Sequence, residues 1–424
     1  MPPAMTSLSV LQVLPFACML LGIALLPLIV PHLWEHPAAP LLLVCACSTP
    51  VALMAAYSGN VHDLAHELEA YLAFIMLIAA LYVTSGGVHI SGNPRGTPVV
   101  NVALLGIGAV AASLIGTTGA SMLLIRPLLQ ANQERRHKRH LVVVFILLVS
   151  NAGGLLTPLG DPPLYLGYLN GVPFHFPLTL WRVWLAAVGF LLAVAWVWDV
   201  RAYRHETLAD LALDTAHATP FVVRGRVNLL LAGGIVALAA AGVPSPWREV
   251  AFGGIIALSL VLTPDDVRDD NSFHYGPLKE VAILFCGIFV TMGPAIRFLE
   301  QIAPRLPVGE PVGLFLMSGA LSSVLDNAPT YLVFASLAAA RAGFDSNLGA
   351  LAAGAPDLLA AVSVGAVLMG ANTYIGNGPN LLVKAVAEGA GPTRVVMPGF
   401  LAYAGIALLV LSPLYACVAW LLRS

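Results

Sequence analysis

The chain has 424 residues, of which 58% are hydrophobic and only 10% are charged, and its mean hydropathy is +0.86. Soluble globular domains carry about a quarter charged residues, so this composition excludes a water-soluble globular protein and predicts a membrane protein. The formal net charge of −2 gives no indication of a nucleic-acid partner.

Apolar segments long enough to cross about 30 Å of hydrocarbon occur along the whole chain. They predict an all-α polytopic protein. The first segment has no basic start and no clear cleavage site, which predicts a retained span rather than a signal peptide. Ten segments predict single crossings, near residues 9–31, 38–57, 69–86, 141–169, 176–200, 227–244, 248–263, 278–303, 359–388 and 396–421.

Two further apolar stretches, 99–132 and 311–338, are interrupted in the middle by small and polar residues, at 116–121 and at 325–330. This pattern predicts re-entrant hairpins that enter and leave the membrane on one side. The alternative is one continuous helix with a polar kink in each place.

Basic residues of short loops orient the chain. The loop 133–140 and the linker 201–226 each carry four Lys or Arg residues, which predicts that both lie in the cytoplasm. With the hairpins counted as non-crossing, each half has five crossings. An odd number inverts the second half, so we expect a first inverted repeat at 1–200, a cytoplasmic linker at 201–226 and a second repeat at 227–424, with both termini outside.

The repeat is also visible in individual residues. Thr157 and Gly160, followed by two prolines, align with Thr373 and Gly376, followed by Pro379. Glycine and proline inside a span free backbone groups, which are tolerated at membrane depth only in a protein interior or a polar cavity. Paired breaks of this kind, within 141–169 and 359–388, predict a binding site near the midplane of the bilayer.

Two acids, Asp161 and Asp326, stand in these interruptions among apolar residues. An ionised carboxylate is costly there unless it is paired, hydrated or coordinated. Both are candidate sodium ligands, and both are also candidates for taking up a proton. For Asp161 the structural alternative is that its side chain caps the half-helix that begins at Pro162.

The motifs at residues 150–163, 326–329 and 370–380 resemble those of the ion transporter superfamily, which includes sodium/proton antiporters, arsenite permease-like proteins, citrate transporters and sodium-coupled dicarboxylate transporters. The resemblance implies a homodimer in which each subunit has a scaffold and a moving transport part. It also implies that the two hairpins and two interrupted helices form the transport part and carry the site in an elevator-like motion.

The hairpin tips, residues 117–119 and 326–328, depart from the Ser-Asn-Thr of sodium-coupled dicarboxylate transporters. We therefore expect a secondary transporter of the cell (inner) membrane that exchanges sodium for protons. The first alternative is cation-coupled transport of citrate or another di- or tricarboxylate. The second is an intramembrane enzyme, although the chain has no Ser-His-Asp or H-E-x-x-H pattern, and no P-loop supports ATP-driven pumping.

The expected partners are membrane lipid, a small inorganic cation or a carboxylate, and a second copy of the chain, with no cofactor apart from sodium ions or protons. The candidate binding residues are the polar residues and glycines of the tips and breaks: Thr117, Thr118, Asn151, Thr157, Gly160, Asp161, Asp326, Asn327, Asn372, Thr373, Gly376, Asn377 and Asn380.

Overall fold

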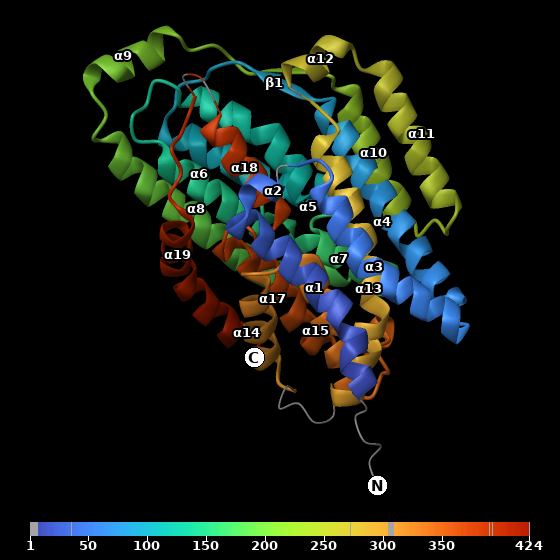
Figure 1. Ribbon diagram of the computed structural model, residues 1–424. Coiled ribbons are helices and arrows are strands. Elements are labelled where there is room, and N and C mark those ends of the chain that lie inside the picture. The colour runs from blue at the N-terminus through green and yellow to red at the C-terminus, as the bar shows by residue number, and fades with distance from the viewer. Residues whose placement is uncertain are drawn as a thin grey trace.

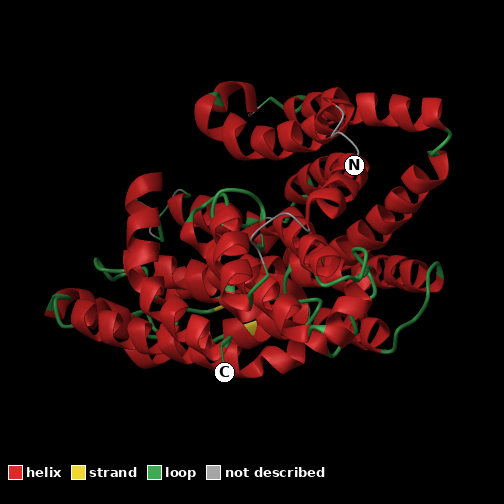
Figure 2. Cartoon of the chain, turned by 90° about the horizontal axis from the view of Figure 1, so that it is seen from below, coloured by secondary structure: helices red, strands yellow, loops and turns green. Residues whose placement is uncertain are grey.

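A computed structural model describes residues 7–34, 36–271, 273–303, 309–389, 391 and 393–423. These residues form helices almost throughout, with two short strands among them (Figures 1 and 2). By length and composition alone, seven helices in these ranges could cross a membrane, Pro98–Ala131 among them, and an eighth crossing results if one bent pair counts as a single span. The prediction of an all-α polytopic membrane protein is confirmed.

The first helices pack against a helix from the second half of the chain. Helices α1 and α3 contact each other and α13, and α4 also contacts α13. The crossing predicted at 69–86 is the second part of a longer helix that begins at Val61. The bounds are α1 (Ser7–Ile29), α2 (Pro31–Trp34), α3 (Ala39–Ser58), α4 (Val61–Gly86), strand β1 (His89–Ser91) and α13 (Gly276–Ile302).

Helix α5 (Pro98–Ala131) folds back on itself at Gly116, whose backbone has φ 80° and ψ 153°. The side-chain amides of Asn101 and Asn132 donate to each other's oxygens at 3.0 and 2.7 Å. A straight helix would place these residues about 46 Å apart. The two arms of the predicted hairpin at 99–132 therefore lie side by side, and its entry into and exit from the membrane on one side stays a prediction.

The segment after this hairpin is the centre of the molecule. Every residue from His140 to Leu148 in α6 is buried, as expected for a helix that is apolar on all sides. The predicted crossing at 141–169 is interrupted, and the chain then runs along a long helix to the face that carries β1. The bounds are α6 (Arg139–Leu148), η1 (Ala152–Leu156), α7 (Pro162–Leu169), η2 (Phe176–Leu180), α8 (Trp181–Tyr203), α9 (Leu208–Ala216) and β2 (Val222–Arg224).

Helices α10 (Val227–Ala240) and α11 (Trp247–Leu262) pack against α4 and against each other. They have 14 and 16 residues, which is shorter than the roughly 20 residues that cross a bilayer without tilt or distortion. A short helix, α12 (Asp265–Asp270), follows them. Figure 1 shows α9, β1 and α12 together at one end of the molecule.

The second half also contains a helical pair followed by an interrupted helix. The pair is α14 (Pro311–Ser322) and α15 (Asn327–Arg341), and the interrupted helix is α17 (Pro356–Met369), η4 (Gly370–Asn372) and α18 (Gly378–Glu388), before α19 (Phe400–Leu421). The sequence did not predict α16 (Leu348–Gly354), which Asn347 caps by accepting from Ala350 N at 2.9 Å. Pro356 then starts α17, and the two helices meet at 116°.

Candidate functional site

Both interrupted helices unwind at the predicted glycine and proline residues. Asp161 directly precedes α7, and Asn377 holds the corresponding place before α18. Both residues have extended backbones, and neither side chain makes a cap bond to its own helix. The alternative that the Asp161 side chain caps α7 is therefore not supported, and its carboxylate is available to other partners.

Those partners come from both hairpin tips and from the second break. Thr117 Oγ1 donates to Asp161 Oδ1 at 2.8 Å, and Asn327 Nδ2 donates to Asp161 Oδ2 at 2.5 Å. Asn377 Nδ2 donates to Asp161 Oδ1 at 3.2 Å. All four side chains are at most 1% exposed. Three elements that are far apart in sequence therefore converge on one buried acid, which stands in a fourth.

The Thr117 and Asn327 tips are positioned by matching contacts in the two halves. The hydroxyl of Thr157 donates to the carbonyl of Ser113 in hairpin α5, and the hydroxyl of Thr373 donates to the carbonyl of Ser323 beside α14, at 2.6 Å in the latter pair. Each predicted threonine thus fastens a break to the neighbouring hairpin. Both hydroxyl groups donate their hydrogen to backbone carbonyls, so they connect the breaks to the hairpins and have no proton left to donate to a ligand.

Gly160 and Gly376 allow each break to close on itself. A Cβ atom at Gly160 would lie 2.1 Å from the carbonyl oxygen of Gly154, and one at Gly376 would lie 2.5 Å from that of Gly370. Neither position has room for a side chain. The Gly160 carbonyl also accepts from Thr117 N at 2.8 Å, which ties the first break to its hairpin tip.

The remaining predicted asparagines are occupied by protein groups. Asn151 donates to Asn380 Oδ1 at 2.8 Å, and its own oxygen accepts from Asn377 at 3.2 Å. Asn380 donates to the carbonyls of Gly370 and Thr373, both at 2.9 Å. These contacts satisfy carbonyl groups that the unwound backbone would otherwise leave unpaired. The structure thus places Asn151 and Asn380 behind the acid, as supports of the breaks.

Asn372 is held in a different contact. Its amide donates to Ser323 Oγ at 2.9 Å, and its oxygen accepts from Tyr415 of α19 at 2.7 Å. Asn372 therefore connects the second break to α14 and α19, and it makes no hydrogen bond to Asp161.

Asp326 differs from Asp161 in its surroundings. It is half-buried and caps α15, accepting from Ala328 N at 3.3 Å. It lines a cavity of about 70 Å³ together with Thr118 and Asn377. A neighbouring cavity of about 30 Å³ is lined by Thr117, Thr118 and Asp161. The two predicted acids thus face adjacent cavities, which share Thr118.

Helix α4 lines both cavities, and α13 lines the larger one. Phe74 and Tyr82 of α4 and Phe285 of α13 line the larger one, and Phe74 stacks on Phe285 with ring centroids 4.7 Å apart. The sequence could not identify these aromatic residues, because their pattern is the same as that of a lipid-facing helix. Among the described residues, no Lys, Arg or His side chain lines either cavity.

One polar atom beside the acid has no partner. Asn327 Oδ1 is buried and accepts no hydrogen bond, although its own amide nitrogen donates to Asp161. A buried acceptor without a partner is costly. A cation held between Asp161 and Asn327 would take this oxygen as a ligand. Carboxylate, amide and hydroxyl oxygens are the ligands that hard cations prefer.

A model of a family described as putative citrate transport matches residues 5–423, which is nearly the whole chain. The resemblance to the ion transporter superfamily, drawn above from three motifs, is confirmed by this match. No curated protein matches the chain.

Proposed function

The chain belongs to the citrate-transport family whose model it matches, and we propose that it is a secondary transporter in which Asp161 carries the coupling cation. The supporting observation is the convergence of both hairpin tips and the second break on this one buried carboxylate. An ion that binds Asp161 changes the contacts of all three elements at once. Ion binding is thereby coupled to the arrangement of the whole site.

Sodium/proton antiport is the first candidate. The cavities are lined by two acids and by no basic residue among the described ones, which favours cations over anions. A single carboxyl group that holds either a sodium ion or a proton exchanges one for the other. Its three side-chain partners are neutral, so among the described residues no bonded group neutralises its charge, and the bound cation does so.

Cation-coupled transport of citrate or a similar carboxylate is the second candidate, favoured by the family match. Thr118 and Asn377 provide hydroxyl and amide groups at the larger cavity. A tricarboxylate would have to arrive with cations, because Asp161 and Asp326 would otherwise repel it. The cavity of about 70 Å³ would also have to enlarge.

We further propose that the two halves form inverted repeats, with the linker 201–226 between them, and that the protein works as a homodimer in the cell (inner) membrane. In this proposal the hairpins α5 and α14–α15, with the interrupted helices α6–α7 and α17–α18, move past α4 and α13. The matched contacts of Thr157 and Thr373 support the repeat. The position of the cavities between the two groups of helices supports the motion.

The test is a combined flux assay with purified protein in liposomes that contain a pH-sensitive dye. Under antiport, external sodium should move protons without citrate. Under carboxylate transport, labelled citrate should enter in a cation-dependent manner while sodium alone moves no protons. Vesicles with the Asp161→Asn variant serve as the control. Neither flux in vesicles with correctly inserted protein would reject both candidates.

A further inference from the structure

Two separate connections pass between the α4 side of the molecule and the hairpin α5 side, and they run together. Residues 87–97 join α4 to α5, and residues 217–226 join α9 to α10. Strands β1 and β2 pair antiparallel within them, with His89 opposite Arg224 and Ser91 opposite Val222. The pairing continues beyond the strands, because Thr219 N donates to the Asn93 carbonyl at 2.8 Å. We call residues 87–97 and 214–228 the strap.

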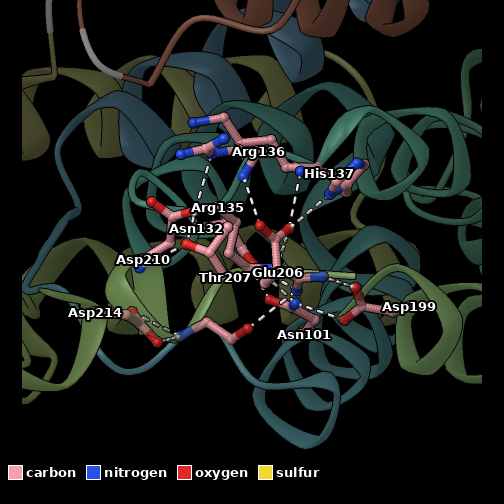
Figure 3. Close-up of polar contacts among 12 residues, drawn as sticks. Asn101, Asn132, Arg135, Arg136, His137, Asp199, Glu206, Thr207, Asp210 and Asp214 are labelled. Atoms are coloured by element: carbon pink, nitrogen blue, oxygen red, sulfur yellow. Dashed lines mark hydrogen bonds and ion pairs between the residues drawn. The ribbon is translucent and has the colours of Figure 1, made fainter. Parts of the chain in front are cut away.

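One end of the strap is fixed in a buried polar cluster at the base of hairpin α5 (Figure 3). The carboxylate of Asp214 accepts from Gly96 N at 3.2 and 3.1 Å, so the two connections are joined again here. Arg135 donates to the Gly96 carbonyl at 3.0 Å and to Asp199 at 2.6 Å. Arg135, Asp199 and Asp214 are each at most 3% exposed.

This cluster also holds the two arms of the hairpin. Asn101 donates to Asp199 Oδ2 at 2.8 Å, and Arg135 donates to Asn132 Oδ1 at 3.1 Å. His140 of α6 lies 2.9 Å from Asp199 Oδ1. Breaking a buried ion pair leaves an uncompensated charge in the interior and is costly, so this end of the strap moves with hairpin α5 and α6.

The other end is fixed to α4, α10 and α12. Asn228 donates to the Gly87 carbonyl at 2.9 Å, and Asn271 donates to the carbonyls of Gly86 and Val88 at 2.9 and 2.7 Å. Arg268 donates to the Val83 carbonyl at 3.1 Å. These side chains satisfy the carbonyl groups at the end of α4, so this end of the strap moves with α4.

Between the two ends, the connections are held to each other mainly by backbone hydrogen bonds. Gly92 follows β1 with φ of 116°, and a Cβ atom there would lie 2.4 Å from the Pro220 carbonyl oxygen. The two connecting segments are therefore in close contact at Gly92 and Pro220, where the paired strands end and the anchored part of the strap begins. A backbone bend at Gly92 is sterically open to glycine and strained for other residues.

We infer that the strap is a single hinge. In this hinge the two connections, residues 87–97 and 217–226, stay hydrogen-bonded to each other while hairpin α5 and the site move relative to α4. This inference rests on the proposed transport function. It assigns a conformational role to β1, β2 and the polar contacts at both ends of the strap, none of which involves Asp161.

The test joins the two strands covalently. In a background with the five native cysteines replaced, Ile90→Cys and Val223→Cys place thiols at paired positions of β1 and β2. Oxidised protein should retain sodium or citrate flux within about twofold of the reduced protein. A disulfide between two strands that never separate restricts no movement that transport needs. Flux that disappears on oxidation and returns with reductant would overturn the inference.

The matched control joins α4 directly to hairpin α5. A Cβ atom at Gly119 would lie 3.5 Å from Ser85 Cβ, which is within the range of a disulfide, so Ser85→Cys with Gly119→Cys should cross-link. Oxidation of this pair should stop the flux that the reduced pair supports, because it bridges the two parts that move. Undiminished flux in this cross-linked control would show that hairpin α5 and α4 do not move apart, and would also overturn the inference.

A second measurement separates the strap from the proposed function. Spin labels at Ser91 and Val222 should give one narrow distance distribution in sodium, in citrate and in neither. A second, longer distance under any of these conditions would overturn the paired hinge. If the unmodified protein moves neither passenger, the proposed function fails, while this distance still decides whether the strands stay paired.

Discussion

Asp161 is the residue on which the proposed function depends most directly. Its carboxylate has three donors and no basic partner. Asp161→Asn keeps the shape of the side chain and removes the charge. Loss of the negative charge should weaken cation binding by about 3 kcal/mol or more, and we therefore expect flux to fall roughly a hundredfold.

The control for this variant is Asp357→Asn, which removes an exposed acid from the first turn of α17. Its flux and Tm should match those of the unmodified protein. If Asp161→Asn transports as fast as this control, Asp161 does not bind the coupling ion.

Asp326 allows a cleaner separation of charge from folding. Asn caps a helix as well as Asp does, so Asp326→Asn should leave α15 and the Tm intact while removing the charge from the larger cavity. We expect flux to be abolished. The reverse exchange at another cap, Asn347→Asp at α16, should leave flux unchanged. Equal flux in the two variants would exclude a role for Asp326 in transport.

The sequence identified the residues around the acid by their chemistry and spacing, and the structure brings Thr117, Asn327 and Asn377 onto Asp161. The sequence could not distinguish Asn151 and Asn380, which support the breaks, from residues that face a cavity. Both kinds of asparagine occur in the same motifs. Their roles differ only in which carbonyl groups lie nearby after folding.

At the level of elements, hairpin α5 depends on one backbone position. Gly116 has φ of 80°, and a Cβ atom there would lie 3.2 Å from the Leu159 carbonyl oxygen. A backbone with positive φ and ψ near 150° is essentially restricted to glycine and costs another residue about 1–3 kcal/mol, so Gly116→Ala should lower the Tm in detergent and reduce flux. Thermal unfolding measured with a thiol-reactive or intrinsic fluorescence probe checks the first part.

Gly106→Ala, in the first arm of the same hairpin, is the matched control. Its Cβ atom would meet only a Leu192 side-chain atom at 3.8 Å, so the Tm should be unchanged or higher. A Tm for Gly116→Ala equal to that of this control would contradict the assigned tip geometry.

The sequence predicts the unwound segments of the interrupted helices but not the bend between α16 and α17. The interruptions near Asp161 and Asn377 were predicted, because glycine and proline cluster there on both halves. Helix α16 was not, since residues 348–354 are apolar and small and resemble an ordinary loop or the start of a crossing. The bend between α16 and α17 depends on Pro356 and on packing that composition does not record.

On the scale of the whole molecule, the loop 133–140 and the linker 201–226 lie on one side, because Arg135 and Arg136 contact Glu206 and Asp210. The basic residues predict that this side is cytoplasmic. In a cysteine-free background, Ala218→Cys should react with a membrane-impermeant maleimide only after right-side-out vesicles are permeabilised. Tyr57→Cys, at a 96% exposed position in the last turn of α3, should react without permeabilisation. The reverse pattern of labelling would invert the proposed topology.

The contacts of Asp161 also have a consequence for biosynthesis. Its partners Asn327 and Asn377 lie 166 and 216 residues later in the chain. While the ribosome is still making the second half, the first half holds an acid in the membrane with only Thr117 beside it. Until hairpin α14–α15 and α18 are inserted, we therefore expect the Asp161 carboxyl group to be protonated or hydrated, or the first half to be bound by a chaperone. A separately expressed first half would be expected to assemble only when the second half is made in the same cell.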